Sequence, residues 1–108
     1  MTESFEKGPE GIPTKEEVLA VISRYAEGAP IVRELSDGRG LYLLEVEIKG
    51  KEPGETIQHV YIREGEFPDG NASLETSIHE VTFQDGVAIG GSSVAVYSPE
   101  TREWVDVK

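Results

Sequence analysis

His59 and His79 are the two histidines of this sequence, and their imidazoles are the side chains best suited to acid–base or metal chemistry. They lack the short spacing, such as His-x-x-x-His, that brings two imidazoles to one metal ion on a helix. Ordinary structural roles are therefore favoured, a half-buried strand residue for His59 and a bulge or surface residue for His79. We accordingly predict neither a cofactor nor a bound metal.

Two carboxylates and a glycine–serine stretch offer other chemistry. Glu45 and Glu47 would place their carboxylates ~7 Å apart on one face of a strand, and glycosidases use paired carboxylates at about that separation. Nothing in the sequence supplies a sugar-binding cleft, so a solvated sheet surface is favoured. The stretch Gly90-Gly91-Ser92-Ser93 could present main-chain N–H groups to an anion, but it lacks the lysine and the helix of a P-loop. A bend in a strand is favoured there.

The elements that would position these residues begin with one amphipathic helix. Thr14 and Glu17 match the capping box that starts a helix. Gly28 and Pro30 then supply the stop signals, which predicts a helix of about 13 residues. Apolar residues recur at helical spacing between these limits: Val18, Val21, Ile22 and Tyr25.

After Gly28 the sequence is typical of short strands separated by turns. The dipeptide Asp85-Gly86 is a strong signal for a two-residue hairpin turn. The predicted strands are 31–36, 41–49, 56–64, 73–84, 87–97 and 102–107. Pairing the second with the third through their loop places Ile48 opposite Ile57 and Val46 opposite His59. This face is largely apolar, and we expect the helix to cover it.

The apolar alternation of the fourth and fifth strands changes parity near His79-Glu80 and near Gly90-Gly91. A β-bulge at each change would restore a common face and bend the sheet. We therefore predict an α+β fold in which one N-terminal amphipathic helix packs on a bent antiparallel sheet of five or six strands. This order resembles cystatin-like helix-on-sheet folds, as an architecture alone. Residues 1–11 are expected to form a flexible arm and 12–108 a single domain.

Candidate binding residues follow from this arrangement. A pocket between helix and sheet would contain His59, Tyr61 and Tyr42. Trp104 is expected either to seal one end of the core or to anchor a partner. Phe67 lies in a long loop and is expected either to tuck into the core or to serve as an exposed recognition element.

A second apolar surface is predicted on the sheet face away from the helix. Apolar residues on a bare sheet face invite a partner, so self-association through this surface is a hypothesis, as is cover by the N-terminal arm or the last strand. Light scattering that shows a monomer at high concentration would count against a homodimer. The surface consists of Leu41, Leu43, Val60 and Ile62.

Composition excludes several classes of partner. The 108 residues contain 21 acidic and 10 basic side chains, for a net charge of −11. Such a field repels phosphate backbones and anionic lipid headgroups, so we predict no binding to nucleic acid or membranes. The chain contains no cysteine, which excludes disulfides and thiol nucleophiles. A cytoplasmic location is expected, because the first twelve residues lack the apolar stretch of a signal peptide.

Three classes of function remain open. A small acidic protein-interaction or regulatory module is favoured. A small-ligand-binding domain with a pocket between helix and sheet is the alternative. An enzyme is the least favoured class, since no nucleophile, base and orienting group can be assembled from the sequence.

Overall fold

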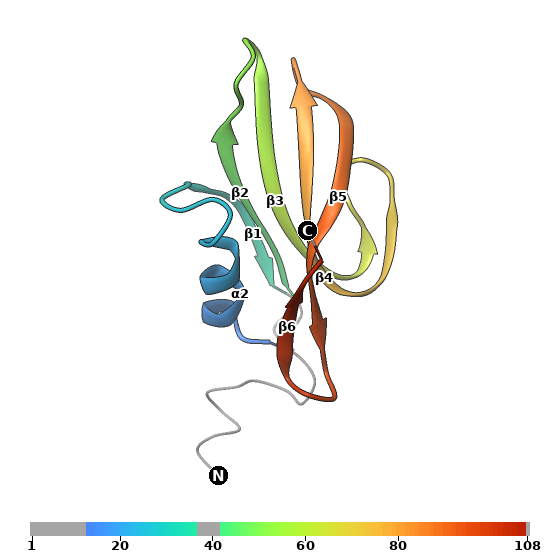
Figure 1. The fold of residues 1–108 in the computed structure, drawn as a ribbon. Coiled ribbons are helices and arrows are strands. Elements are labelled where there is room, and N and C mark those ends of the chain that lie inside the picture. The colour runs from blue at the N-terminus through green and yellow to red at the C-terminus, as the bar shows by residue number, and fades with distance from the viewer. Residues whose placement is uncertain (1–12, 37–41, 108) are drawn as a thin grey trace.

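In the part of the chain that the structure describes, the fold is mostly sheet, with one short helix packed on it (Figure 1). The computed structural model describes residues 13–36 and 42–107, with the backbone alone for Ser36 and Tyr42. The predicted arm 1–11 therefore lies outside the described residues. The elements in chain order are α2 (Lys15–Ile22), β1 (Ile31–Ser36), β2 (Tyr42–Lys49), β3 (Glu55–Glu66), β4 (Ala72–Gln84), β5 (Val87–Ser98) and β6 (Glu103–Asp106).

Helix α2 begins where the sequence predicts and ends earlier. Thr14 and Glu17 form the predicted capping box. The predicted length of about 13 residues is wrong, because α2 has 8 residues and ends at Ile22. The Leu19 carbonyl accepts both the main-chain N–H and the hydroxyl of Ser23. The chain then continues in tighter turns up to Gly28, whose φ is +77°.

The six strands form one antiparallel sheet in the order β1-β2-β3-β4-β5-β6. Their positions agree with the predicted ranges and differ only at the strand ends. The predicted pairs Ile48–Ile57 and Val46–His59 are confirmed. Asp85 and Gly86 both have positive φ, 52° and 85°, as a two-residue turn between β4 and β5 requires.

Two rows of directly paired residues cross the same four strands, one residue apart. The inner row lies on the face that packs against α2, and all its members are buried. It consists of Leu44, Tyr61, Ile78 and Ala95. The outer row lies on the opposite face of the sheet. It consists of Glu45, Val60, His79 and Ser93.

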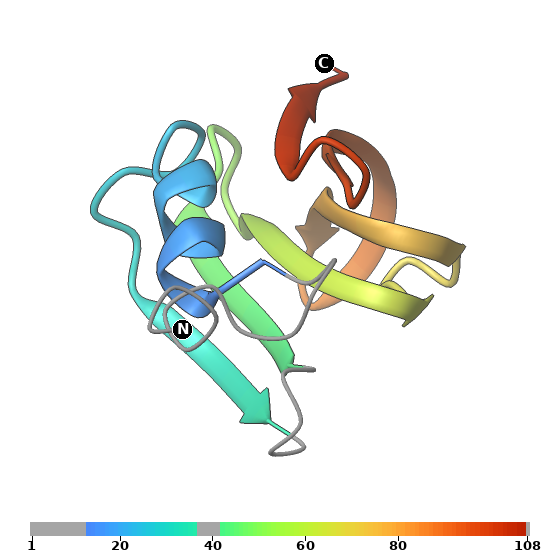
Figure 2. The same ribbon diagram turned by 90° about the horizontal axis from the view of Figure 1, so that it is seen from below.

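The sheet curls from β1 round to β6, with α2 on the inner side of the curve (Figure 2). Two register shifts in the β4–β5 pair contribute to this curl, one between Ile78 and His79 and one between Thr82 and Phe83. Both extra residues, Val94 and Ile89, belong to β5. The bulge predicted near Gly90-Gly91 is therefore present, whereas the one predicted near His79-Glu80 lies on β5 opposite His79 and not within β4.

Candidate functional site

His59 and Tyr61 lie on the inner face, beneath the helix and the turns that follow it. Both side chains are buried. The His59 ring stacks on Tyr25, with centroids 6.0 Å apart, and its Nε2 lies 3.1 Å from Glu80 Oε2. Burial raises the pKa of Tyr61 above its ordinary value. Tyr61 belongs to the hydrophobic core between α2 and the sheet, and Tyr42, the third predicted pocket residue, has no described side chain.

Trp104 belongs to an aromatic cluster at the edge of this core. Its ring centroid is 5.3 Å from that of Tyr97 and 6.3 Å from that of Tyr61. The side chain is half-buried. Of its two predicted roles, this placement matches the sealing of one end of the core.

The residues of the apolar surface predicted for self-association differ in burial. Val60 is fully buried, so its side chain is unavailable to a partner in the folded chain. Leu43 and Ile62 are half-buried. Leu41 lies outside the described residues.

The carboxylates of Glu45 and Glu47 are each engaged by a neighbour. Arg33 forms an ion pair with the buried Glu45, and the Gln58 side-chain amide donates to Glu47 at 3.1 Å. A pair of acids acting on one substrate would need both carboxylates to face an open cleft. This pair instead stabilises the sheet surface between β1, β2 and β3.

The loop between β3 and β4 folds back over the outer row. Phe67 is only 3% exposed, and its ring stacks on His79 with centroids 4.2 Å apart. Of the two alternatives predicted for Phe67, the buried one therefore describes its position, and the exposed one does not. The loop closes on itself through main-chain bonds from Phe67 to Asn71 and from Gly70 to Phe67.

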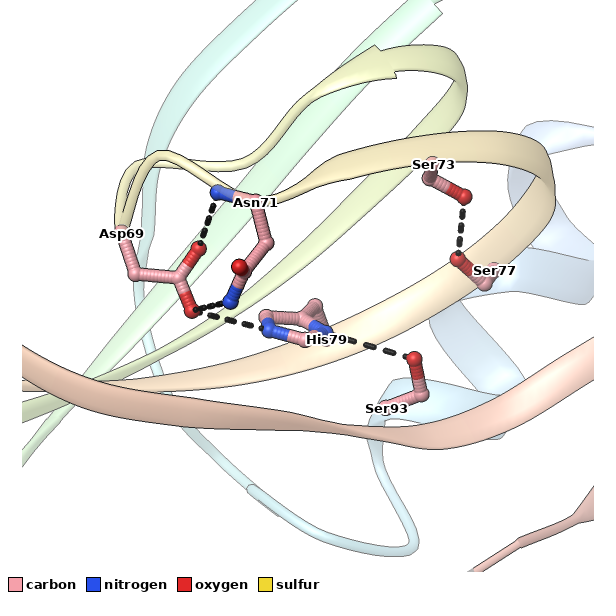
Figure 3. A network of polar contacts seen from close by, with 6 residues as sticks. All are labelled: Asp69, Asn71, Ser73, Ser77, His79 and Ser93. Carbon is pink, nitrogen blue, oxygen red and sulfur yellow. Dashed lines mark hydrogen bonds and ion pairs between the residues drawn. The ribbon is translucent and has the colours of Figure 1, made fainter.

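The same loop carries an aspartate to the histidine (Figure 3). Asp69 Oδ2 lies 3.0 Å from His79 Nε2, and His79 Nδ1 lies 3.4 Å from Ser93 Oγ. Both side chains of the Asp69–His79 pair are nearly buried, at 6% and 7% exposure. Burial opposes ionisation of Asp69, but the Asn71 hydrogen bonds and the contact with His79 outweigh it and lower the pKa of Asp69.

The sequence alone did not place Asp69 and Ser93 beside this histidine. Counting back from the Asp85-Gly86 turn in uninterrupted register pairs His79 with Ser92. The bulge at Ile89 shifts the register by one residue, so His79 pairs with Ser93 instead. The sequence did contain a signal for this shift, which is the change of parity near Gly90-Gly91. Counting from the Asp85-Gly86 turn and allowing for one bulge at this change would have paired His79 with Ser93.

An open hollow of about 610 Å³ lies where β3 ends and β4 begins. Leu74 in its wall is 90% exposed, more than any other large apolar side chain described. Glu64 has a positive φ of 52° beside a register shift in β3. The hollow is lined by Glu64, Gly65, Glu66, Ala72, Ser73 and Leu74.

Known proteins do not narrow the interpretation. No protein-family model matches the chain, and no curated protein or solved structure shows significant similarity to it. Within residues 13–36 and 42–107, no group of three or more His, Cys, Asp or Glu side chains is arranged to hold a metal ion. Among those residues, no helix combines the length and the apolar character needed to cross a bilayer.

Proposed function

We propose that this chain is a protein-interaction module whose hollow beside Leu74 binds a basic segment of a partner protein that also carries an apolar side chain. The observation that carries this proposal is the exposure of Leu74, 90%, in the wall of a hollow that also contains Glu64 and Glu66. A leucine so exposed gains free energy when a partner covers it.

Charge supports the basic character of the partner. Glu64 and Glu66 are both exposed, and the whole chain carries a net charge of −11. A negative field of this size attracts cationic segments and accelerates their encounter. Rim carboxylates of this kind act mostly on the association rate and on its salt dependence.

Fluorescence anisotropy with synthetic peptides tests the proposal. The probes are labelled twelve-residue peptides that combine lysine or arginine with leucine or phenylalanine. We expect Leu74→Ser to weaken the best peptide about tenfold, because a buried leucine contributes about 1.5–3 kcal/mol. Raising the salt concentration is expected to weaken binding further, since exposed charges are screened.

The matched control is Val87→Ser. Val87 is 64% exposed on β5 beside the Asp85-Gly86 turn and does not line the hollow. We expect its peptide affinity to stay within twofold of the unmodified chain. Equal losses in the two variants, or no binding by any peptide of the set, would contradict the proposal.

A further inference from the structure

The hydrogen-bonded chain from Asp69 through His79 to Ser93 joins a carboxylate, an imidazole and a hydroxyl (Figure 3). We propose that Ser93 is a nucleophile that transfers small acyl groups from exposed esters to water, with His79 as its general base and Asp69 as the group that orients the base. This inference is independent of peptide binding at the Leu74 hollow.

The ionised carboxylate of Asp69 determines which imidazole nitrogen carries the proton. A carboxylate only accepts hydrogen bonds, and Asp69 already accepts two from Asn71, both at 3.0 Å. His79 Nε2, 3.0 Å away, must therefore be the protonated nitrogen and donate to it. His79 Nδ1 then has a lone pair directed at the Ser93 hydroxyl, which is the arrangement a general base requires.

The imidazole is held in this orientation by its neighbours. Phe67 stacks on one face of the ring, and Gly91 lies beside it on β5. A Cβ on Gly91 would come within 2.5 Å of Asp69 Oδ2 and 3.1 Å of His79 Nε2. Because Gly91 has no side chain, the carboxylate of Asp69 and the imidazole of His79 have enough space to contact each other.

The bulges of β5 direct Ser93 to the histidine. Residues two apart on a regular strand share a face, so Ser93 would lie with Ala95 on the inner face. The extra residue Val94 reverses this relation, and Ser93 pairs with His79 on the outer face. Bulges that re-aim a side chain in this way are frequent next to active sites.

Substrate access is provided by the edge of β5. Among the described residues, β6 pairs only with Ala95–Ser98, so the preceding part of β5 lies at the edge of the sheet. Gly90, Gly91 and Ser92 are exposed, and Ser93 is half-buried. A strand edge offers main-chain N–H groups, the kind of donor that holds the oxyanion in acyl transfer. Because Ser93 is half-buried, a small acyl group reaches its hydroxyl more readily than a bulky one.

The proposed reaction has two balanced steps. Ser93 Oγ attacks the carbonyl carbon of the ester while its proton passes to His79 Nδ1. The bond from carbon to the leaving oxygen breaks, and the proton on Nδ1 goes to that oxygen, which leaves as an alcohol. Water then attacks the acyl-serine with the same base, releases the carboxylic acid and restores the hydroxyl. Serine proteases accept the serine proton on Nε2, whereas here the two nitrogens exchange roles.

The test uses the full chain and a fluorophosphonate, a reagent that phosphonylates activated serines. Peptide mass spectrometry is expected to find the modification on Ser93 in the folded protein and to find none in urea, where the three groups are separated. Ser93→Ala is expected to abolish the label, whereas the control Ser92→Ala keeps it. A folded protein that shows no label on Ser93 overturns the proposal.

A second measurement separates catalysis from simple exposure. Hydrolysis of p-nitrophenyl acetate by His79→Gln is expected to fall at least a hundredfold, since general bases contribute 10²–10⁴, and circular dichroism checks that the variant folds. If it does not fold, Ser93→Ala decides, and its rate is expected to fall at least a hundredfold as well. A rate in Ser93→Ala equal to that of the unmodified chain overturns the proposal.

Discussion

The inner and outer rows cross the same strands one residue apart, yet they are buried by different means. Leu44, Tyr61 and Ile78 of the inner row are covered by the apolar side of α2. The outer row has the polar side chains of Glu45 and Ser93 at its ends, and the loop between β3 and β4 covers its centre. A buried apolar side chain can pack against many kinds of apolar neighbour, whereas a buried polar group requires a specific hydrogen-bond partner. We therefore expect the inner row to contribute most of the stability of the sheet and to act as the support of the fold. The outer row depends on specific polar contacts between its side chains and the loop.

The largest effect is expected in the inner row. Leu44→Ala removes a fully buried side chain and is expected to lower the free energy of unfolding by about 3 kcal/mol, through lost burial and the cavity left behind. Urea unfolding followed by circular dichroism measures this change. The control is Leu35→Ala, an exposed leucine of β1, expected to change stability by less than about 0.5 kcal/mol. Similar losses at both sites would remove the basis for treating the inner row as the support.

An intermediate effect is expected where the outer row is most closely packed. A Cβ on Gly91 would lie 2.8 Å from the Glu80 main-chain oxygen as well as close to Asp69. We expect Gly91→Ala to cost about 2 kcal/mol, because backbone and loop must both shift. Gly90→Ala is the matched control, since a Cβ there meets nothing within 4 Å. If thermal unfolding gave the same stability for the two variants, the outer row would be less tightly packed than its contacts indicate.

The smallest effect is expected from the charge of Asp69, and it depends on pH. Its pKa is lowered in the folded chain, so its stabilisation is present above the unfolded value of about 4 and is lost as the pH falls through the folded pKa. Asp69→Asn is therefore expected to cost about 1 kcal/mol at pH 7. This difference from the unmodified chain should shrink below about pH 4.

Urea unfolding at pH 7 and pH 3 measures the effect of Asp69. The control is Asp85→Asn, in an exposed turn whose positive φ asparagine tolerates. We expect the control to show little change at either pH. A difference for Asp69→Asn that stays constant between the two pH values would show that the carboxylate charge contributes no stability to the outer row.

Local signals in the sequence predicted most of the sheet and part of the helix. The capping box at Thr14 and the turn at Asp85-Gly86 are short-range features, in which side chains act on backbone groups a few residues away. The pairing of Val46 with His59 followed because a loop and an apolar pattern together set the register. The end of α2 was missed, because the main-chain bonds tighten to the third residue back at Arg24 and Tyr25 while the apolar pattern continues to Tyr25.

The candidate site was predicted only in fragments. His79, Phe67 and the Gly90–Ser93 stretch were each identified from the sequence, but with separate roles. Whether Phe67 was exposed or buried depended on which way its loop folds, and this is decided by the His79 ring against which it packs. Stacking between residues on different strands leaves no periodic signal in the sequence.

The sequence by itself determined where the helix starts, where each strand lies and how β2 pairs with β3, because these depend on contacts between residues close in the chain. Only the tertiary structure decided that Asp69, His79 and Ser93 meet, since this needs the two bulges of β5 and the folding of a loop onto the sheet. A bulge moves a side chain from one face to the other. One extra residue therefore decides whether Ser93 lies beside the helix or beside the histidine.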